Sequence, residues 1–177
     1  MLRYIAFLRG INVSGQKIIK MELLRKALTD EGFPDVKTYI QSGNVVFNSN
    51  NTVPEQLIQQ IEDLIEQSFG FRTDVILRRT SDIKTIVDSP LFNTLKSDES
   101  KRYYITFLKS SFTDPLALPL FSKNKDVEII YANEMDFISV STLYKGNYGF
   151  PNAFIEKLTG IPATTRNPNT LEKLLTI

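Results

Sequence analysis

Four short polar segments of this chain hold residues that could bind a charged ligand. The first is Arg9-Gly10-Ile11-Asn12, which continues through Ser14 and Gly15 to Lys17. Glycines in a strand-to-helix loop let backbone N–H groups approach an anion, and the two cations add positive charge. The segment is not a Walker A loop, which needs Gly-Lys-Ser/Thr at the start of a helix. The alternative is an ordinary loop in which the glycines adopt positive φ.

The second and third segments combine small polar residues with an arginine or an amide. In Gln41-Ser42-Gly43-Asn44 the amides and the hydroxyl could bind a phosphate or a base edge, or the segment could simply be a hairpin turn. Thr164-Thr165-Arg166-Asn167 precedes the last predicted helix, whose N-terminus would favour an anion or a carboxylate. The alternative for this segment is a helix cap, with the arginine bound to a carboxylate of the neighbouring half.

The fourth segment combines aromatic residues with a lysine and glycines. Such a loop can stack on nucleobases, although its aromatic side chains can equally anchor the loop to the protein. The residues concerned are Tyr144, Lys145, Gly146, Asn147, Tyr148 and Phe150.

The composition excludes more chemistry than it suggests. The 177 residues include no cysteine and no histidine, which excludes disulfides, zinc fingers, cysteine nucleophiles and histidine bases. The acidic residues near 62–66 and 126–136 are typical of solvated surface rather than of a metal site. We therefore expect no cofactor and no metal, and enzymatic activity stays open.

The charge is nearly balanced, with 21 Lys and Arg against 20 Asp and Glu. A duplex-binding protein usually shows a clustered excess of basic residues, and none is visible here. No apolar run approaches the ~20 residues that span a membrane, and the N-terminus lacks a signal-peptide pattern. We expect a cytoplasmic protein with no membrane partner, and the oligomeric state stays open.

The elements that must position these segments predict an α+β protein. Residues 2–78 alternate as βαββαβ, the ferredoxin-like order. The apolar run 4–8 fits a central strand covered on both faces, residues 21–28 have helical spacing, and 36–48 predicts a hairpin. A capping box, Thr52-Val53-Pro54-Glu55, predicts the start of the second helix.

The second half is less regular and predicts a smaller α+β unit with a helical tail. The stretch 113–120 contains two prolines and predicts a short helix or a turn. The other expected elements are a helix at 81–87, strands at 102–108, 127–131 and 137–140, and helices at 151–158 and 169–175. We expect two packed subdomains, residues 1–79 and 80–177.

Topology suggests how the segments are distributed. In a ferredoxin-like half we expect the loop after the first strand and the turn between strands two and three at opposite ends of the sheet. One compact site would then need the second half, and we expect Thr165-Arg166-Asn167 to lie against the Arg9 loop.

Three of these segments carry a resemblance to a known family. Leu8-Arg9-Gly10-Ile11-Asn12-Val13, Tyr39-Ile40-Gln41-Ser42-Gly43-Asn44-Val45-Val46-Phe47 and Pro162-Ala163-Thr164-Thr165-Arg166-Asn167 together resemble an uncharacterised bacterial family, the domain-of-unknown-function family 1697. The resemblance implies a two-part α+β fold with a ferredoxin-like N-terminal half and no established activity. The chain departs from the family at Ser14, where a second glycine is common, and at Pro168, where an aromatic residue is common.

The function we expect is the binding of a small anionic ligand, a nucleotide or a nucleic-acid end in a cleft between the two halves. The alternatives are a histidine-independent enzyme of phosphate or acyl chemistry and a structural or protein-interaction module. The predicted ligand-binding residues are Arg9, Gly10, Asn12, Ser42, Gly43, Asn44, Thr165, Arg166 and Asn167.

Overall fold

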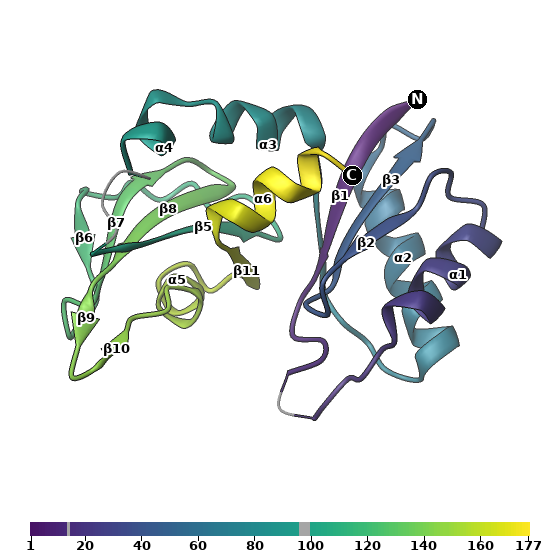
Figure 1. The fold of residues 1–177 in the computed structure, drawn as a ribbon, viewed down its shortest axis with the longest axis horizontal. Coiled ribbons are helices and arrows are strands. Elements are labelled where there is room, and N and C mark those ends of the chain that lie inside the picture. Colours follow the sequence, from purple (N-terminus) through teal and green to yellow (C-terminus); the bar gives the residue numbers. More distant parts are fainter. Residues whose placement is uncertain (14, 96–99) are drawn as a thin grey trace. The chain divides into compact units, whose positions relative to one another are not determined.

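The fold was analysed in a computed structural model that describes residues 1–13, 15–95 and 100–177. The chain divides into two compact units (Figure 1). Unit 1 comprises Met1–Lys84 together with Lys173–Ile177, and unit 2 comprises Thr85–Glu172. The division into folding subdomains at residue 79 stays a prediction. No helix of the described residues is both long and apolar enough to cross a lipid bilayer.

Unit 1 contains a four-stranded antiparallel sheet with the strand order β2-β3-β1-β4. Its elements follow one another in the predicted order of strands and helices. They are β1 (Leu2–Leu8), α1 (Met21–Asp30), β2 (Lys37–Tyr39), β3 (Asn44–Ser49), α2 (Pro54–Phe69) and β4 (Val75–Arg79).

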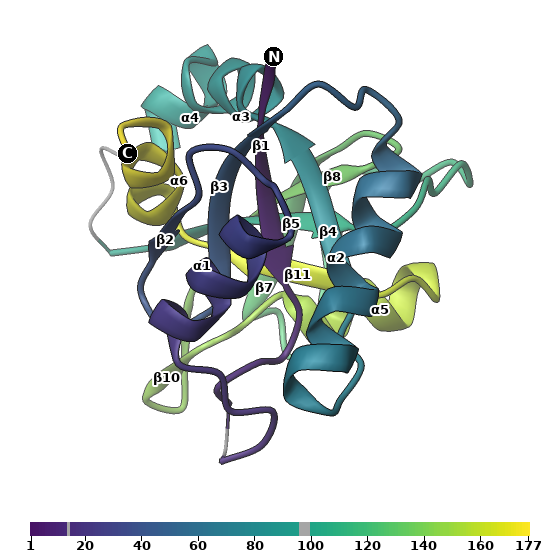
Figure 2. The same ribbon diagram turned by 90° about the vertical axis from the view of Figure 1, so that its right-hand side faces the viewer.

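The central position of β1 follows from its composition. Residues 4–8 are apolar on both alternating faces, and each is at most 1% exposed. Helices α1 and α2 cover one face of the sheet (Figure 2). Met21, Leu24 and Leu28 of α1 pack into the core there, as their spacing predicts.

The start of α2 differs from the predicted capping box. The helix begins at Pro54, its N-cap is Val53, and no side chain caps it. Instead, the Val53 N–H donates to Asn51 Oδ1 at 3.0 Å. Proline at the first helical position needs no N–H partner, which leaves one fewer donor to cap. The helix ends at Gly70, whose φ of 78° matches the left-handed C-cap that glycine favours.

Unit 2 contains a five-stranded antiparallel sheet with the order β11-β5-β8-β7-β6 and a separate hairpin, β9–β10. Helices α3 (Thr80–Val87) and α6 (Pro168–Leu175) each span a boundary between the units. The remaining elements are α4 (Pro90–Leu95), β5 (Arg102–Leu108), β6 (Leu120–Phe121), β7 (Val127–Ala132), β8 (Asp136–Ser141), β9 (Leu143–Tyr144), β10 (Asn147–Tyr148), α5 (Asn152–Thr159) and β11 (Ala163–Arg166).

Both faces of this sheet are buried: Ile105 and Phe107 of β5 face one side, and a hydrophobic cluster lies on the other. Leu108, Phe137 and Ala163 of three neighbouring strands pack there with Ile155 of α5. The short strands β6, β9, β10 and β11 carry too few residues for a period-two pattern, which explains why the sequence did not predict them. Strand β11 exists because residues 163–166 pair with β5.

Candidate functional site

The first two polar segments meet at one end of the unit 1 sheet. Strands β1 and β3 are antiparallel, with Phe7 opposite Asn44, and Leu8 N donates to Gly43 O at 2.8 Å. Our expectation that they lie at opposite ends is therefore wrong. In an antiparallel pair the last residue of one strand lies beside the first residue of the other, so the β1 loop meets the β2–β3 turn. We call this region, residues 9–13, 15–20 and 40–44, the turn junction (Figure 2).

Asn12 connects the two halves of the turn junction. Its Nδ2 donates to Gln41 O at 2.7 Å and to Ile19 O at 3.0 Å, while its Oδ1 accepts from Ile19 N at 2.8 Å. Asn12 also has a φ of 55°, which asparagine tolerates better than most residues. Both N–H groups of its amide nitrogen therefore donate to backbone carbonyls, one in the loop and one in the turn.

Gly43 and Asn44 also have structural roles. Gly43 has a φ of 75°, and a Cβ there would lie 2.8 Å from both Leu8 Cβ and Ile11 Cδ1. Asn44 is fully buried, and its Nδ2 donates to Tyr39 O at 3.1 Å and to Ser42 Oγ at 3.0 Å. Only glycine fits the close approach of the turn to β1, and Asn44 closes the turn from inside.

Arg9 places a partly exposed cation at the same end of the sheet. Its Nη1 lies 3.6 Å from Asp74 Oδ2, and its backbone N–H donates to Asp74 O at 2.9 Å. Thr73 Oγ1 donates to Arg9 O at 2.5 Å. Gly10 follows with a φ of 67° and open space around it. Ser14, which belongs to the predicted segment, lies outside the described residues.

The third segment forms β11 and the N-cap of α6 in unit 2. Thr165 Oγ1 donates its single proton to Asn152 Oδ1 at 3.0 Å. It must therefore accept the hydrogen bond of 2.8 Å that joins it to Thr106 Oγ1. Asn167 Oδ1 accepts from Thr170 N at 2.9 Å, so this segment caps the helix, as its alternative interpretation expects.

Arg166 is buried within this segment. Its Nη1 donates to Thr164 Oγ1 at 2.6 Å and to Thr165 O at 2.8 Å. Burial lowers the pKa of Arg166 to about 10, because the charged guanidinium loses its hydration. Arg9 belongs to unit 1 and Arg166 to unit 2, and their convergence on one site stays a prediction.

The fourth segment forms the exposed β9–β10 hairpin. Lys145 and Gly146 have φ values of 49° and 85°, as a two-residue type I′ turn requires. Tyr148 Oη donates to Ser100 O at 3.1 Å and ties the hairpin to the start of β5. Gly149 packs so closely on β7 that a Cβ would lie 2.6 Å from Val127 Cγ2.

Two cations lie over aromatic rings of this hairpin, one from β5 and one from the hairpin itself. Arg102 Cζ lies 4.8 Å from the centre of the Tyr148 ring, and Lys145 Nζ lies 5.3 Å from that of Tyr144. Tyr104 and Phe150 form an edge-to-face pair with ring centres 5.4 Å apart. Phe150 is 58% exposed and Tyr144 is 39% exposed. We call this set the hairpin surface: Arg102, Tyr104, Tyr144, Lys145, Tyr148 and Phe150.

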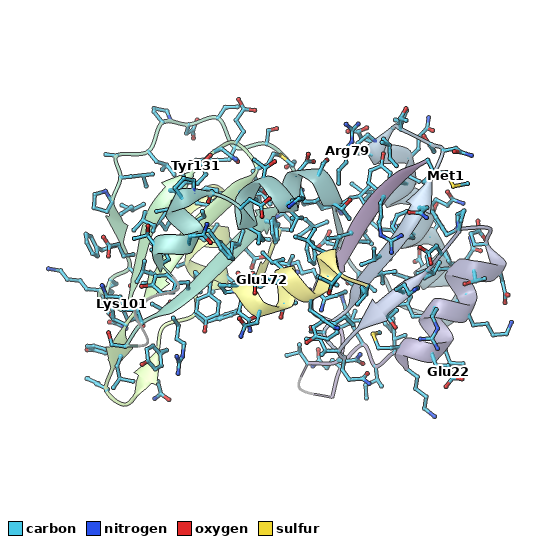
Figure 3. The ribbon with its side chains drawn as sticks, turned by 45° about the horizontal axis from the view of Figure 1, so that its top comes forward. Met1, Glu22, Arg79, Lys101, Tyr131 and Glu172 are labelled. Atoms are coloured by element: carbon cyan, nitrogen blue, oxygen red, sulfur yellow. The ribbon has the colours of Figure 1, made fainter. Side chains whose placement is uncertain are left out.

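Arg102 and Tyr104 are the members that the sequence did not single out. They occupy alternate positions of β5, opposite Ser141 and Ser139 of β8, and therefore share a face with those serines. Nothing in the local pattern of a strand indicates which distant loop crosses it. Lys101, which is labelled in Figure 3, precedes this strand. It is a third exposed cation near the hairpin, after Arg102 and Lys145.

The acidic residues that the structure describes do not gather into a group suited to a metal ion. Across residues 1–13, 15–95 and 100–177 no group of three or more carboxylates could hold an ion. Glu62 Oε1 instead accepts from Val75 N at 2.8 Å, and Asp126 Oδ1 accepts from Ser122 Oγ at 2.7 Å. These carboxylates bond to backbone and hydroxyl groups of their own unit.

The chain shares its fold with a solved structure. A protein described as conserved bacterial protein SP0830 from Streptococcus pneumoniae matches with a TM-score of 0.68 at 24% sequence identity, over 99% of this chain and 97% of that one. This likeness concerns the fold. No curated protein matches the sequence. The model of a family described as "Protein of unknown function (DUF1697)" matches residues 1–137. Since that model covers most of the chain and the three motifs point to the same family, the protein belongs to the DUF1697 family.

Proposed function

We propose that this protein binds ligands that combine a planar ring with negative charge, namely nucleotides or the ends of single-stranded nucleic acids, through the hairpin surface of unit 2. The observation that carries the proposal is the pairing of cations with rings on both faces of the hairpin. Arg102 lies over Tyr148 beside the exposed Phe150, and Lys145 lies over Tyr144 on the opposite face. Rings can stack on bases, and the cations can contact phosphates.

Local charge supports this proposal. Residues 100–108 and 143–150 contain Lys101, Arg102 and Lys145 and no acidic residue. The chain as a whole is nearly neutral, so attraction to an anion depends on such a local excess. A cytoplasmic location, where nucleotides and RNA are abundant, belongs to the same proposal.

The polar side chains of the other segments already form hydrogen bonds within the protein, which favours the hairpin as the ligand site. In the turn junction the amides of Asn12 and Asn44 bond to backbone and hydroxyl groups of unit 1, and Thr165 and Asn167 bond within unit 2. A ligand that bound to these side chains would break those hydrogen bonds and would destabilise the loop, turn or helix end that they hold. Tyr144 and Phe150 can be covered by a ligand with no such loss.

The test is fluorescence anisotropy with a fluorescein-labelled oligothymidine and with competing ATP. Phe150→Ala is expected to weaken oligonucleotide binding about tenfold, since one base–ring stack is lost. Phe121→Ala is the matched control, because Phe121 is also an exposed aromatic residue of unit 2. Equal affinity of the wild type and Phe150→Ala, or no binding at all, would contradict the proposal.

The cations are tested separately by salt dependence. Arg102→Gln and Lys145→Gln are each expected to reduce the slope of log affinity against log salt by about one phosphate contact. Lys123→Gln, at an exposed lysine of the same unit, is the control and should leave the slope unchanged. If competing ATP displaces the oligonucleotide and the slope is shallow, the ligand is a nucleotide rather than a strand.

A further inference from the structure

The turn junction of unit 1 exposes three branched aliphatic side chains that nothing in its own folding explains. Ile18 is 66% exposed, Val13 58% and Ile40 50%. Their backbone positions are brought together by Asn12, which bonds to the carbonyl groups of Ile19 and Gln41. Val13, Ile18 and Ile40 are each the chain neighbour of one of these three bonded residues. Figure 2 shows this end of the sheet, where β1 runs into the loop that leads to α1.

Ile40 is held in an unfavourable conformation. Its φ is 50°, in the left-handed region that β-branched residues avoid. Asparagine or glycine would adopt this turn position with less strain. A half-exposed isoleucine at such a position does not favour the turn, and it lies outside the hydrophobic core cluster of unit 1. Strain of this kind at an exposed apolar residue points to a role in contact with another surface.

The charges beside these side chains are positive. Residues 9–21 and 36–43 contain Arg9, Lys17, Lys20 and Lys37 and no acidic residue. Arg9 lies near Asp74 and Lys37 near Asp35, whereas Lys17 and Lys20 are exposed at the aliphatic loop itself. A partner of this surface must therefore offer negative charge together with an apolar layer.

We infer that the turn junction binds reversibly to an anionic lipid surface, with Val13, Ile18 and Ile40 entering the headgroup boundary and Lys17 and Lys20 contacting lipid phosphates. Turn-borne aliphatic side chains flanked by lysines combine apolar insertion with attraction to anionic lipid. The expectation of no membrane partner rested on the lack of a spanning run, and a surface contact needs none.

Other occupants fit these observations less well. A second copy of the chain would bring like charges together at Lys17 and Lys20. A nucleic acid would contact the lysines but make no use of the aliphatic side chains. An added peptide strand would need a longer edge, because β2 has three residues and ends before the left-handed Ile40.

The test is cosedimentation of the full chain with vesicles of mixed phosphatidylglycerol and phosphatidylcholine, compared with phosphatidylcholine alone. The wild type should pellet with the anionic vesicles only and be released by salt. Ile18→Ser and Ile40→Asn should each weaken binding about tenfold, since each removes carbon atoms from the interface. Lys17→Gln should weaken binding to anionic vesicles by several-fold.

Two controls separate binding from folding. Ile40→Asn relieves the strained turn, so its melting temperature should rise while its vesicle binding falls. Val53→Ser removes an exposed aliphatic side chain elsewhere on unit 1 and should bind vesicles as the wild type does. The inference is overturned if the wild type does not pellet with anionic vesicles, or if Val53→Ser loses as much binding as Ile18→Ser. It is also overturned if Ile18→Ser loses affinity for the oligonucleotide instead of for the vesicles. The proposal for the hairpin surface is tested independently by Phe150→Ala, Arg102→Gln and Lys145→Gln.

Discussion

The turn junction of unit 1 and the hairpin surface of unit 2 are both built from turns that hold glycine at positive φ, yet they use their polar residues in opposite ways. In the turn junction, Asn12 and Asn44 point inward and bond to backbone groups. In the hairpin, Tyr144 and Lys145 are exposed at a type I′ turn. A polar motif therefore identifies a ligand site only after its own hydrogen bonds have been assigned.

The largest expected effect separates a glycine that packs from one that only turns. Gly43→Ala should cost about 3 kcal/mol of unfolding free energy, because the new Cβ adds overlap with Leu8 and Ile11 to the strain of positive φ. Gly10→Ala, which meets open space, should cost only about 1 kcal/mol. Urea denaturation measures both. Equal losses would mean that steric fit at Gly43 does not hold the turn junction together.

The next effect tests the inward amides. Asn12→Ala should cost about 2 kcal/mol, because the buried Ile19 backbone loses its partners and Gln41 O loses its donor. Asn147→Ala, at an exposed asparagine of the hairpin, should stay within about 0.5 kcal/mol of the wild type. Chemical denaturation of the two variants reports the difference. A larger loss for Asn147→Ala would reverse the comparison of the two regions.

A smaller effect of opposite sign is expected beneath the hairpin surface. Ser139 Oγ and Ser141 Oγ are buried without a hydrogen-bond partner among the described residues. Ser139→Ala should therefore leave stability unchanged or raise it by up to about 1 kcal/mol. Thr106→Val should lower stability by about 1 kcal/mol, because its hydroxyl bonds to Thr165. If both variants lose stability equally, the serine hydroxyl has a hydrogen-bonding partner in solution.

The smallest effect concerns an exposed ion pair of unit 1. The hydrogen bond from Arg3 lowers the pKa of Asp35 below 3.8. Folding therefore gains stability from the ionised carboxylate above that pH, and the gain is lost as the pH falls through the lowered pKa. Asp35→Asn should melt slightly below the wild type at neutral pH, and the difference should vanish in acid. A difference that persists in strong acid would point to packing rather than to charge.

Local sequence patterns predicted most helices and strands but not the tertiary contacts between them. The apolar run 4–8 and the spacing of Met21, Leu24 and Leu28 predicted the central strand and the first helix correctly. The capping box before α2 was wrong, because a local motif competes with the bonds that Asn51 makes instead. The strands of two residues in unit 2 carried no signal of their own.

The placement of the candidate residues shows where sequence reasoning ends. Nothing around Arg102 indicates that Tyr148, 46 positions later by residue number, lies over its guanidinium. The same holds for Asn12 and Gln41, which the sequence assigned to opposite ends of a sheet. Such contacts depend on strand pairing over long chain distances, which periodicity within one segment does not contain.

By itself the sequence determined the α+β class, the burial of β1 on both faces, the absence of cysteine and histidine chemistry, and the family. Each of these depends on residue types or on spacing within one segment. The tertiary structure decided which polar residues are consumed by folding and which remain exposed. The physical reason is that these hydrogen bonds join groups that are distant in the chain, so they form only after the strands have paired. Pairing brings the end of β1 beside the start of β3, and the β9–β10 hairpin bonds to the start of β5.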